Sequence, residues 1–278
     1  MRYASRKLVR GALMALVGLT FLALPQTVSA WPARVSESIA RDARRLLPHA
    51  LAAALARRDD EVRSEMGRLP EDLTRSLAAD LLSGRLTPET LAAAQSPIDA
   101  ALALFKTRHV GEGLVRLGGL ARVPIDLCDA SLASEERLPA RVREEYYLFV
   151  QENLGKMPVV LSDPHALELT RGDLPGYWQR LLDDSRADTA VIRAEMLRGA
   201  QVVDHRAIDY RSPVFAVASL SYSRAVTAVA GTWLAVWREA HGDLSLRPRP
   251  IEVIPSAPVT AQPAGRGLVA PRPNSEVR

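Results

Sequence analysis

Apolar residues recur every three or four positions through most of the chain after Trp31. This spacing is typical of amphipathic helices, because residues three and four apart lie on the same helix face. The pattern predicts helices over 36–47, 49–62, 71–82, 88–105, 139–154, 187–197 and 214–240. Strand-like runs occur only at 157–161 and 201–204, which is too little for a sheet. We therefore predict an all-α, single-domain helical bundle.

Prolines and glycines mark the ends of the predicted helices. They fall at Pro48, Gly67 with Pro70, Gly84, Pro124, Pro139, Pro164, Pro175 and Pro213. Proline lacks the backbone N–H that a helix interior requires, so each proline is expected at a helix start or end. Thr87 followed by Pro88 predicts a capped helix start, with the threonine hydroxyl accepting a backbone N–H.

The segment from Val214 to Trp237 is apolar enough to be compared with a membrane span. Arg224 lies near its middle, with Ser221 and Ser223 close by. A charged side chain at the centre of a bilayer is costly. We therefore predict a buried core helix here, and no transmembrane helix once a signal peptide has been removed.

Residues 1–30 have the organisation of a secretory signal peptide. A basic start is followed by the apolar run GALMALVGLTFLAL and the small-residue end TVSA. Cleavage is expected between Ala30 and Trp31, which places the helical domain at 31–242 and the protein in the periplasm or outside the cell. Residues 243–278 are rich in proline and lack a helical period, so they predict a disordered tail through which a partner could bind.

The formal net charge of +4 comes entirely from Arg2, Arg6, Lys7 and Arg10. The chain from Trp31 onward is therefore neutral, and its composition does not indicate a nucleic-acid partner. It contains a single cysteine, so an exported form has no intramolecular disulfide and depends on its hydrophobic core for stability.

One helix end and the expected mature N-terminus resemble segments of a known superfamily. In LVRLGGLARVPID, the residues Arg116, Leu120 and Asp126 have the spacing H-x-x-x-D-x-x-x-P-x-H. The sequence WPARVSESIARDA begins with Trp31 and has Ser36 five residues later. Both patterns are similar to those of the zinc-dependent phospholipase C and fungal single-strand nuclease superfamily, in which these positions bind a cluster of three zinc ions.

The same superfamily has a later H-x-x-x-E/D helix, which the segment ARVREEYYLFVQ resembles. Arg143 and Tyr147 take the ligand positions there, or the register differs by two residues. Asp72, which follows Pro70, is similar to a residue that supplies another ligand. The resemblance implies a phospholipase C-like scaffold over 31–242 with a remnant site made of Trp31, Ser36, Asp72, Arg116, Leu120, Asp126, Arg143 and Tyr147.

Most of these residues are not zinc ligands. If a structural zinc site is worth ~10 to 16 kcal/mol, each ligand contributes about 3 kcal/mol, and losing two leaves the site largely empty. We therefore expect no zinc cofactor and a non-catalytic protein with a binding or structural role. The first alternative is a metal-dependent phosphodiesterase that keeps a reduced zinc site through Trp31, Asp72 and Asp126, with His49 or His109 added. The second alternative is an unrelated helical adaptor.

The loss of metal raises the question of what holds the helix end at 116–126. The two histidine positions of the superfamily converge on one cluster, so we predict that Arg116 and Asp126 form an ion pair in place of the metal. The alternative is a solvated arginine and an aspartate that caps the next turn.

Three other groups could carry chemistry. Asp163 with His165, and Asp204 with His205, lie in proline-broken loops and could bind a metal only if a third ligand lies nearby. Cys128 is expected to be a small buried side chain, because no histidine is close to it in the sequence.

Overall fold

The computed structural model describes residues 31–134, 136–161 and 163–242 of the 278-residue chain. These residues are mostly helical, and the only strands among them form one two-stranded antiparallel hairpin. The prediction of an all-α fold is confirmed. The predicted signal peptide at 1–30 and the predicted tail at 243–278 lie outside the described residues.

The elements follow one another in a simple order along the chain. The longer helices are α2 (Ala33–Arg44), α3 (His49–Ala56), α4 (Asp59–Met66), α5 (Glu71–Ser83), α6 (Pro88–Lys106), α7 (Val110–Gly119), α9 (Ala140–Asn153), α11 (Leu174–Met196) and α12 (Pro213–Glu239). The short elements are α8 (Arg122–Leu127), η1 (Leu154–Lys156), α10 (Ala166–Thr170), β1 (Leu197–Arg198), β2 (Gln201–Val202) and η2 (His205–Ala207).

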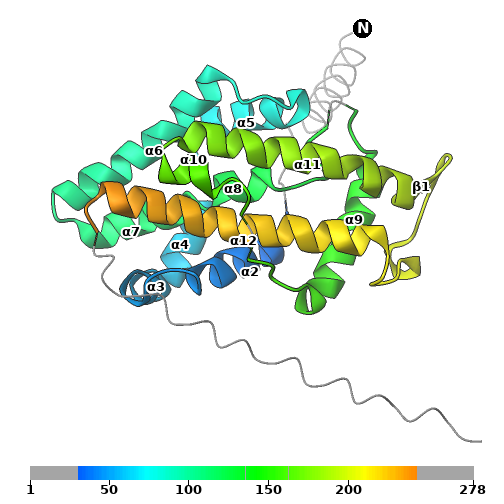
Figure 1. Cartoon of the computed structure of the whole chain (residues 1–278), viewed down its shortest axis with the longest axis horizontal. Helices are drawn as coiled ribbons and strands as arrows, with labels where there is room; N and C mark the ends of the chain where they lie inside the picture. Colours follow the sequence, from blue (N-terminus) through cyan, green and yellow to red (C-terminus); the bar gives the residue numbers. More distant parts are fainter. Residues whose placement is uncertain (1–30, 135, 162, 243–278) are drawn as a thin grey trace, which may run out of the picture.

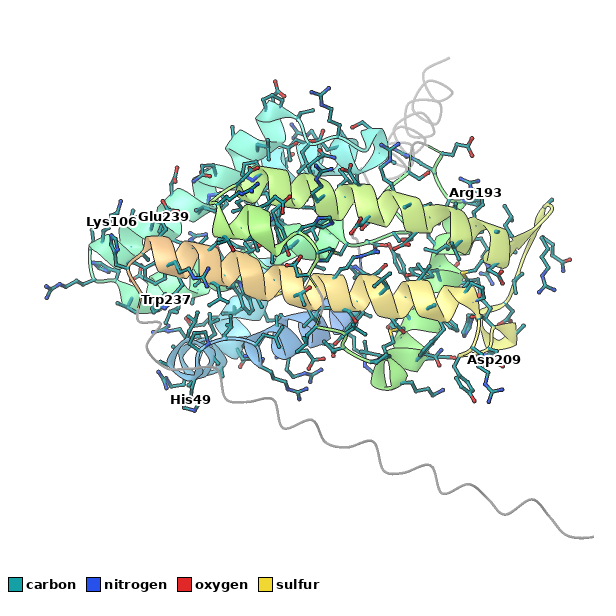
Figure 2. All side chains as sticks on the ribbon, viewed as in Figure 1. His49, Lys106, Arg193, Asp209, Trp237 and Glu239 are labelled. Carbon is teal, nitrogen blue, oxygen red and sulfur yellow. The ribbon has the colours of Figure 1, made fainter. Side chains whose placement is uncertain are left out.

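Helix α12 runs through the centre of the bundle (Figure 1). Helix α11 lies antiparallel beside it, and α2 and α8 pack against it from other sides. Helices α4, α6 and α7 form a second group, joined to the first where Phe105 meets Trp237 edge to face, with ring centroids 5.4 Å apart. Figure 2 shows this junction, where Lys106 at the end of α6 lies beside the end of α12.

Helix α12 is the one described helix that is long and apolar enough to cross a membrane, by length and composition. In the structure, 61% of its apolar window is buried within the protein. Its central Arg224 forms an ion pair with Asp188 of α11 and lies 3.5 Å from a carboxylate oxygen of Asp184. Acidic partners on a packed neighbour explain why an arginine is tolerated there, and they agree with the prediction of a core helix.

Local signals place the turn between α5 and α6. Thr87 accepts the backbone N–H of Thr90 at 3.3 Å, as its position before Pro88 predicts. The buried carboxylate of Asp80 accepts the Thr87 N–H at 2.6 Å and so ties the end of α5 to the start of α6. Gly84 closes α5 with φ at 72°, a conformation that glycine adopts with little strain.

Several predicted boundaries were wrong. The helix expected at 49–62 is broken after Ala56, and the one expected at 187–197 belongs to the longer α11. The helix end expected in 116–126 falls at Gly119, where α7 stops, and the chain begins a further helix, α8, before it reaches Pro124. First-turn N–H groups have no partner within their helix, so proline costs little there. Residues 157–161 do not form a strand.

Candidate functional site

A buried carboxylate marks the candidate site, where α8 leads toward α9. Asp129 has no exposed surface. One of its oxygens accepts the backbone N–H of Ser131 at 2.9 Å and the Ser131 hydroxyl at 2.7 Å. Its other oxygen accepts the hydroxyl of Tyr147, from α9, at 2.8 Å. Burial raises the pKa of Asp129, and these hydrogen bonds oppose that rise.

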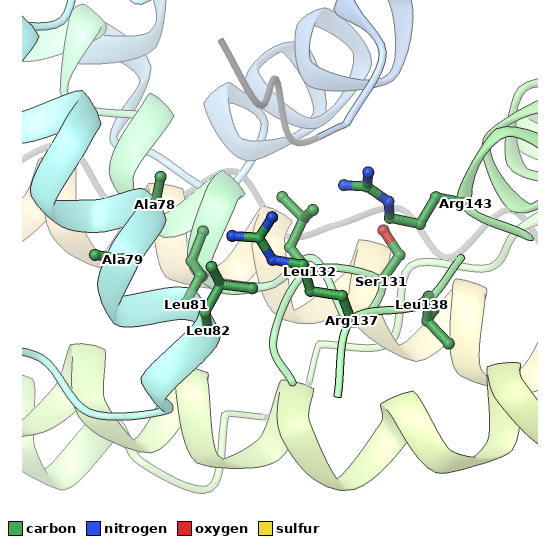
Figure 3. A pocket seen from close by; sticks show the side chains of 9 residues that line it. All are labelled: Ala78, Ala79, Leu81, Leu82, Ser131, Leu132, Arg137, Leu138 and Arg143. Atoms are coloured by element: carbon green, nitrogen blue, oxygen red, sulfur yellow. The ribbon is translucent and has the colours of Figure 1, made fainter. Parts of the chain in front are cut away.

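An open cavity of about 260 Å³ adjoins this cluster. Figure 3 shows α5 on one side of the cavity, Arg143 of α9 on the other, and the loop residues Ser131, Leu132, Arg137 and Leu138 between them. Its lining consists of Ala78, Ala79, Leu81, Leu82, Ser131, Leu132, Arg137, Leu138 and Arg143. The lining is therefore largely aliphatic, with two guanidinium groups and one hydroxyl.

The two arginines reach the cavity from different elements. Arg137 is exposed in the loop, and its side chain extends toward α5 (Figure 3). Arg143 is partly buried on α9, and its Nε is buried without a hydrogen-bond partner. Within the described parts of the chain, neither guanidinium has a carboxylate within 4.0 Å. A buried N–H group without a hydrogen-bond partner costs free energy, so this site lacks a hydrogen-bond acceptor.

The expected mature N-terminus packs close to α9. Trp31 is fully buried, and its ring centroid lies 6.1 Å from that of Tyr146. Tyr146 is in turn 6.1 Å from its neighbour Tyr147, which reaches the Asp129 cluster. Ser36 donates a long hydrogen bond of 3.4 Å to the carbonyl oxygen of Trp31. The structure therefore brings Trp31, Ser36 and Tyr147 into one region.

The predicted ion pair between Arg116 and Asp126 does not form. Arg116 of α7 instead pairs with Glu65 of α4 at the surface. Asp126 is buried in the short helix α8. Its two carboxylate oxygens accept hydrogen bonds from Nε of Arg122, in the same helix, at 2.7 and 2.8 Å. Burial raises the pKa of Asp126 to about 6, although Arg122 acts to lower it. The predicted pair does not form because each residue has a nearer partner. Arg122 lies one helical turn before Asp126, and Glu65 lies on α4, which packs against the helix that carries Arg116.

The other residues implied by the resemblance are placed apart from the cavity lining. Asp72 is exposed in the first turn of α5, and Leu120 is buried in the core after α7. His49 is exposed at the start of α3, at the edge of the molecule in Figure 2, and His109 is an exposed surface residue beside Glu112. Neither histidine joins Asp126 in a cluster of three donors within the described residues.

The residues at the zinc-ligand positions do not fit a centre of three zinc ions. A guanidinium is always cationic and has no lone pair to donate, which applies to both Arg116 and Arg143. Leu120 offers only hydrocarbon, and Tyr147 already donates its hydroxyl proton to Asp129. What this region can offer a ligand is positive charge and apolar surface.

A second polar cluster joins α9 to the short η2 element, and we call it the His205 clasp. His205 is buried, with Nδ1 2.7 Å from Glu145 and Nε2 3.1 Å from Glu152. Arg141 lies 2.7 Å from the other oxygen of Glu145, and Asp204 lies 3.5 Å from Nδ1. The hydrogen bond to Glu145, followed by that to Glu152, raises the pKa of His205, while the bond to His205 lowers the pKa of Glu145.

The clasp contains the one group of three donors in the described residues that could hold a metal: Glu145, Asp204 and His205. The pair Asp204 and His205, which the sequence indicated as a possible metal site if a third ligand lies nearby, therefore has that third potential ligand in Glu145. Both ring nitrogens contact carboxylates at hydrogen-bonding distance, and an imidazolium with two N–H donors satisfies that geometry. The other predicted pair, at 163 and 165, forms no such group, because His165 turns to Asp184 at 3.2 Å.

Asp129, Ser131, Glu145 and Glu152 were not singled out in the sequence analysis. Asp129 and Ser131 form an aspartate–x–serine turn, in which the carboxylate accepts the N–H two residues on, and that pattern was a usable signal. Glu145 and Glu152 are seven residues apart and therefore share one face of α9. Their common partner His205 is distant in the sequence, and no local pattern connects it to them.

No protein-family model, curated protein sequence or solved structure matches this chain. The resemblance to the zinc-dependent phospholipase C superfamily thus rests on the sequence segments described above and stays a prediction.

Proposed function

We propose that this protein is an exported, non-catalytic binding protein on a phospholipase C-like scaffold, with a guanidinium-lined cavity near the region where the superfamily holds zinc. The observation that carries the proposal is the buried, unpartnered Nε of Arg143 at the wall of an open cavity. A cation that forms no ion pair within the described residues, beside accessible apolar surface, is the arrangement expected of a ligand site.

The chemistry of the neighbouring residues also favours binding over hydrolysis. Hydrolysis of a phosphodiester at neutral pH needs an activated water, which the superfamily obtains from zinc. Asp129, whose partner Ser131 lines the cavity, is fully buried and already accepts three hydrogen bonds, so it is badly placed to activate a water.

Elemental analysis and a hydrolysis assay on the same purified protein test the proposal. The protein is dialysed without chelator, its zinc content is measured, and it is incubated with bis(4-nitrophenyl) phosphate. We expect zinc far below one ion per chain and no release of nitrophenol above background from a folded, helical protein. Stoichiometric zinc together with hydrolysis that is lost in Asp126→Asn would overturn the proposal in favour of the reduced-site phosphodiesterase.

A further inference from the structure

The cavity between α5 and α9 has two chemically distinct sides. Leu81 and Leu82 of α5, with Leu132 and Leu138 of the loop, give it an aliphatic side. Arg137 and Arg143 face the same space from the loop and from α9, as Figure 3 shows. A ligand that fills this cavity needs both a hydrocarbon part and an acceptor for guanidinium N–H groups.

The charges around the cavity set the charge of that ligand. Arg137 and Arg143 contribute two positive charges, and no ion pair neutralises either of them in the part of the chain that the structure describes. Arg143 acts electrostatically on the buried Asp129, which lies behind the cavity wall. The two guanidinium groups therefore favour a ligand with an anionic head.

The size of the cavity limits the ligand further. A dry apolar cavity of about 150 Å³ accommodates benzene, which has six non-hydrogen atoms. By proportion, a cavity of about 260 Å³ accommodates roughly ten non-hydrogen atoms. Octanoate and hexyl phosphate are of this size, whereas a complete two-chain phospholipid is several times larger.

We propose that this cavity binds a small anionic amphiphile, with its carboxylate or phosphate head on Arg143 and Arg137 and its short apolar tail against the leucines of α5 and the loop. A planar guanidinium binds either head through two parallel N–H donors, and Arg137 and Arg143 both line the cavity. The inference rests on the binding function proposed above and names the ligand class of that same site.

Calorimetric titration of the full-length purified protein tests the inference. The probes are octanoate and hexyl phosphate, with acetate and methyl phosphate as heads without a tail and hexanol as a tail without a head. We expect binding of at least one amphiphilic anion and at least tenfold weaker binding of every control. Binding of octanoate alone identifies a carboxylate ligand, and binding of hexyl phosphate alone identifies a phosphate ester.

Variants locate the site. Arg143→Gln removes a charge-assisted bidentate contact and should weaken binding by about 10- to 100-fold. Ala78→Phe keeps both charges but fills the apolar side, and it should also abolish measurable binding. Arg198→Gln removes an exposed arginine of the hairpin, which does not line the cavity, and it should leave the affinity unchanged. Thermal unfolding confirms that each variant is folded.

The inference is wrong if neither amphiphile binds, or if folded Arg143→Gln and Ala78→Phe proteins bind as the unaltered protein does. Failure of this inference can be told apart from failure of the proposed function. If the protein is zinc-free and inactive but binds neither amphiphile, only the proposed ligand class is wrong. If it contains stoichiometric zinc and hydrolyses the diester, the proposed binding function itself is wrong.

Discussion

Replacement of His205 by glutamine should remove a part of the stability that depends on pH. The hydrogen bonds to Glu145 and Glu152 raise the pKa of His205, so the folded state holds its proton more tightly than the unfolded state. This stabilisation is complete below the unfolded pKa of about 6.5 and is lost as the pH rises through the folded pKa. The lowered pKa of Glu145 acts in the opposite direction, with stabilisation above about pH 4.3 that is lost on acidification.

The magnitude follows from the two contacts. The bond between His205 and Glu145 joins two buried groups, and a charge-assisted bond of this kind contributes about 1.5 to 3 kcal/mol. The Glu152 side chain is 54% exposed, so solvent screening limits its contact to about 0.5 kcal/mol. Arg141 and Asp204 also face the imidazole–carboxylate pair, and their opposite charges partly cancel. We expect His205→Gln to cost about 2 to 3 kcal/mol near pH 5.5 and about 1 kcal/mol near pH 9.

Urea unfolding at pH 5.5, 7 and 9 measures this effect as the difference in unfolding free energy between the unaltered protein and the variant. Taking the difference cancels the titration of the other histidines. Glu152→Gln is the matched control, because it removes only the exposed contact and should cost less than 1 kcal/mol at every pH. The reasoning is refuted if the cost of His205→Gln is the same at pH 5.5 and pH 9, or if it increases with pH.

Three further outcomes test the packing. Arg224→Met should cost about 3 kcal/mol in urea unfolding, because Asp188 is left without its cation, and a cost below 1 kcal/mol would contradict the ion network in the core. Gly84→Ala should cost about 1 kcal/mol and lower the melting temperature, since φ there is 72° and a Cβ would meet the Arg186 side chain; an unchanged melting temperature would contradict the left-handed turn. Burial raises the pKa of the Cys128 thiol, so an aromatic disulfide reagent should modify it only after unfolding, and rapid labelling of the native protein would show that the site is open.

Hydrophobic periodicity was enough to predict the fold class and most helices, because each helix buries one face against α12 or its neighbours. Boundaries were predicted less well where local and tertiary preferences compete. The apolar pattern of 49–62 is continuous, yet the chain turns after Ala56 so that α4 can pack on α7. Pro124 was expected at a helix start or end, and it lies in the first turn of α8, where a missing N–H costs little.

The candidate site was only partly accessible from the sequence. Arg143 and Tyr147 were singled out by the resemblance of their segment to the H-x-x-x-E/D helix of the superfamily, and the structure places both near Asp129. The pairing of Arg116 could not be foreseen, because Glu65 lies on a different helix and only tertiary packing brings it near. The clasp around His205 has the same origin, since its partners on α9 are more than fifty residues away in the sequence.

Titration of hexyl phosphate into protein dialysed against EDTA, repeated with one equivalent of Zn²⁺, tests most directly whether the cavity binds an anion through its own arginines. We expect the same dissociation constant with and without zinc, and no release of inorganic phosphate in either case. Binding that appears only after zinc is added, or that is accompanied by hydrolysis, would contradict the metal-free site and return the protein to the class of metal-dependent phosphoesterases.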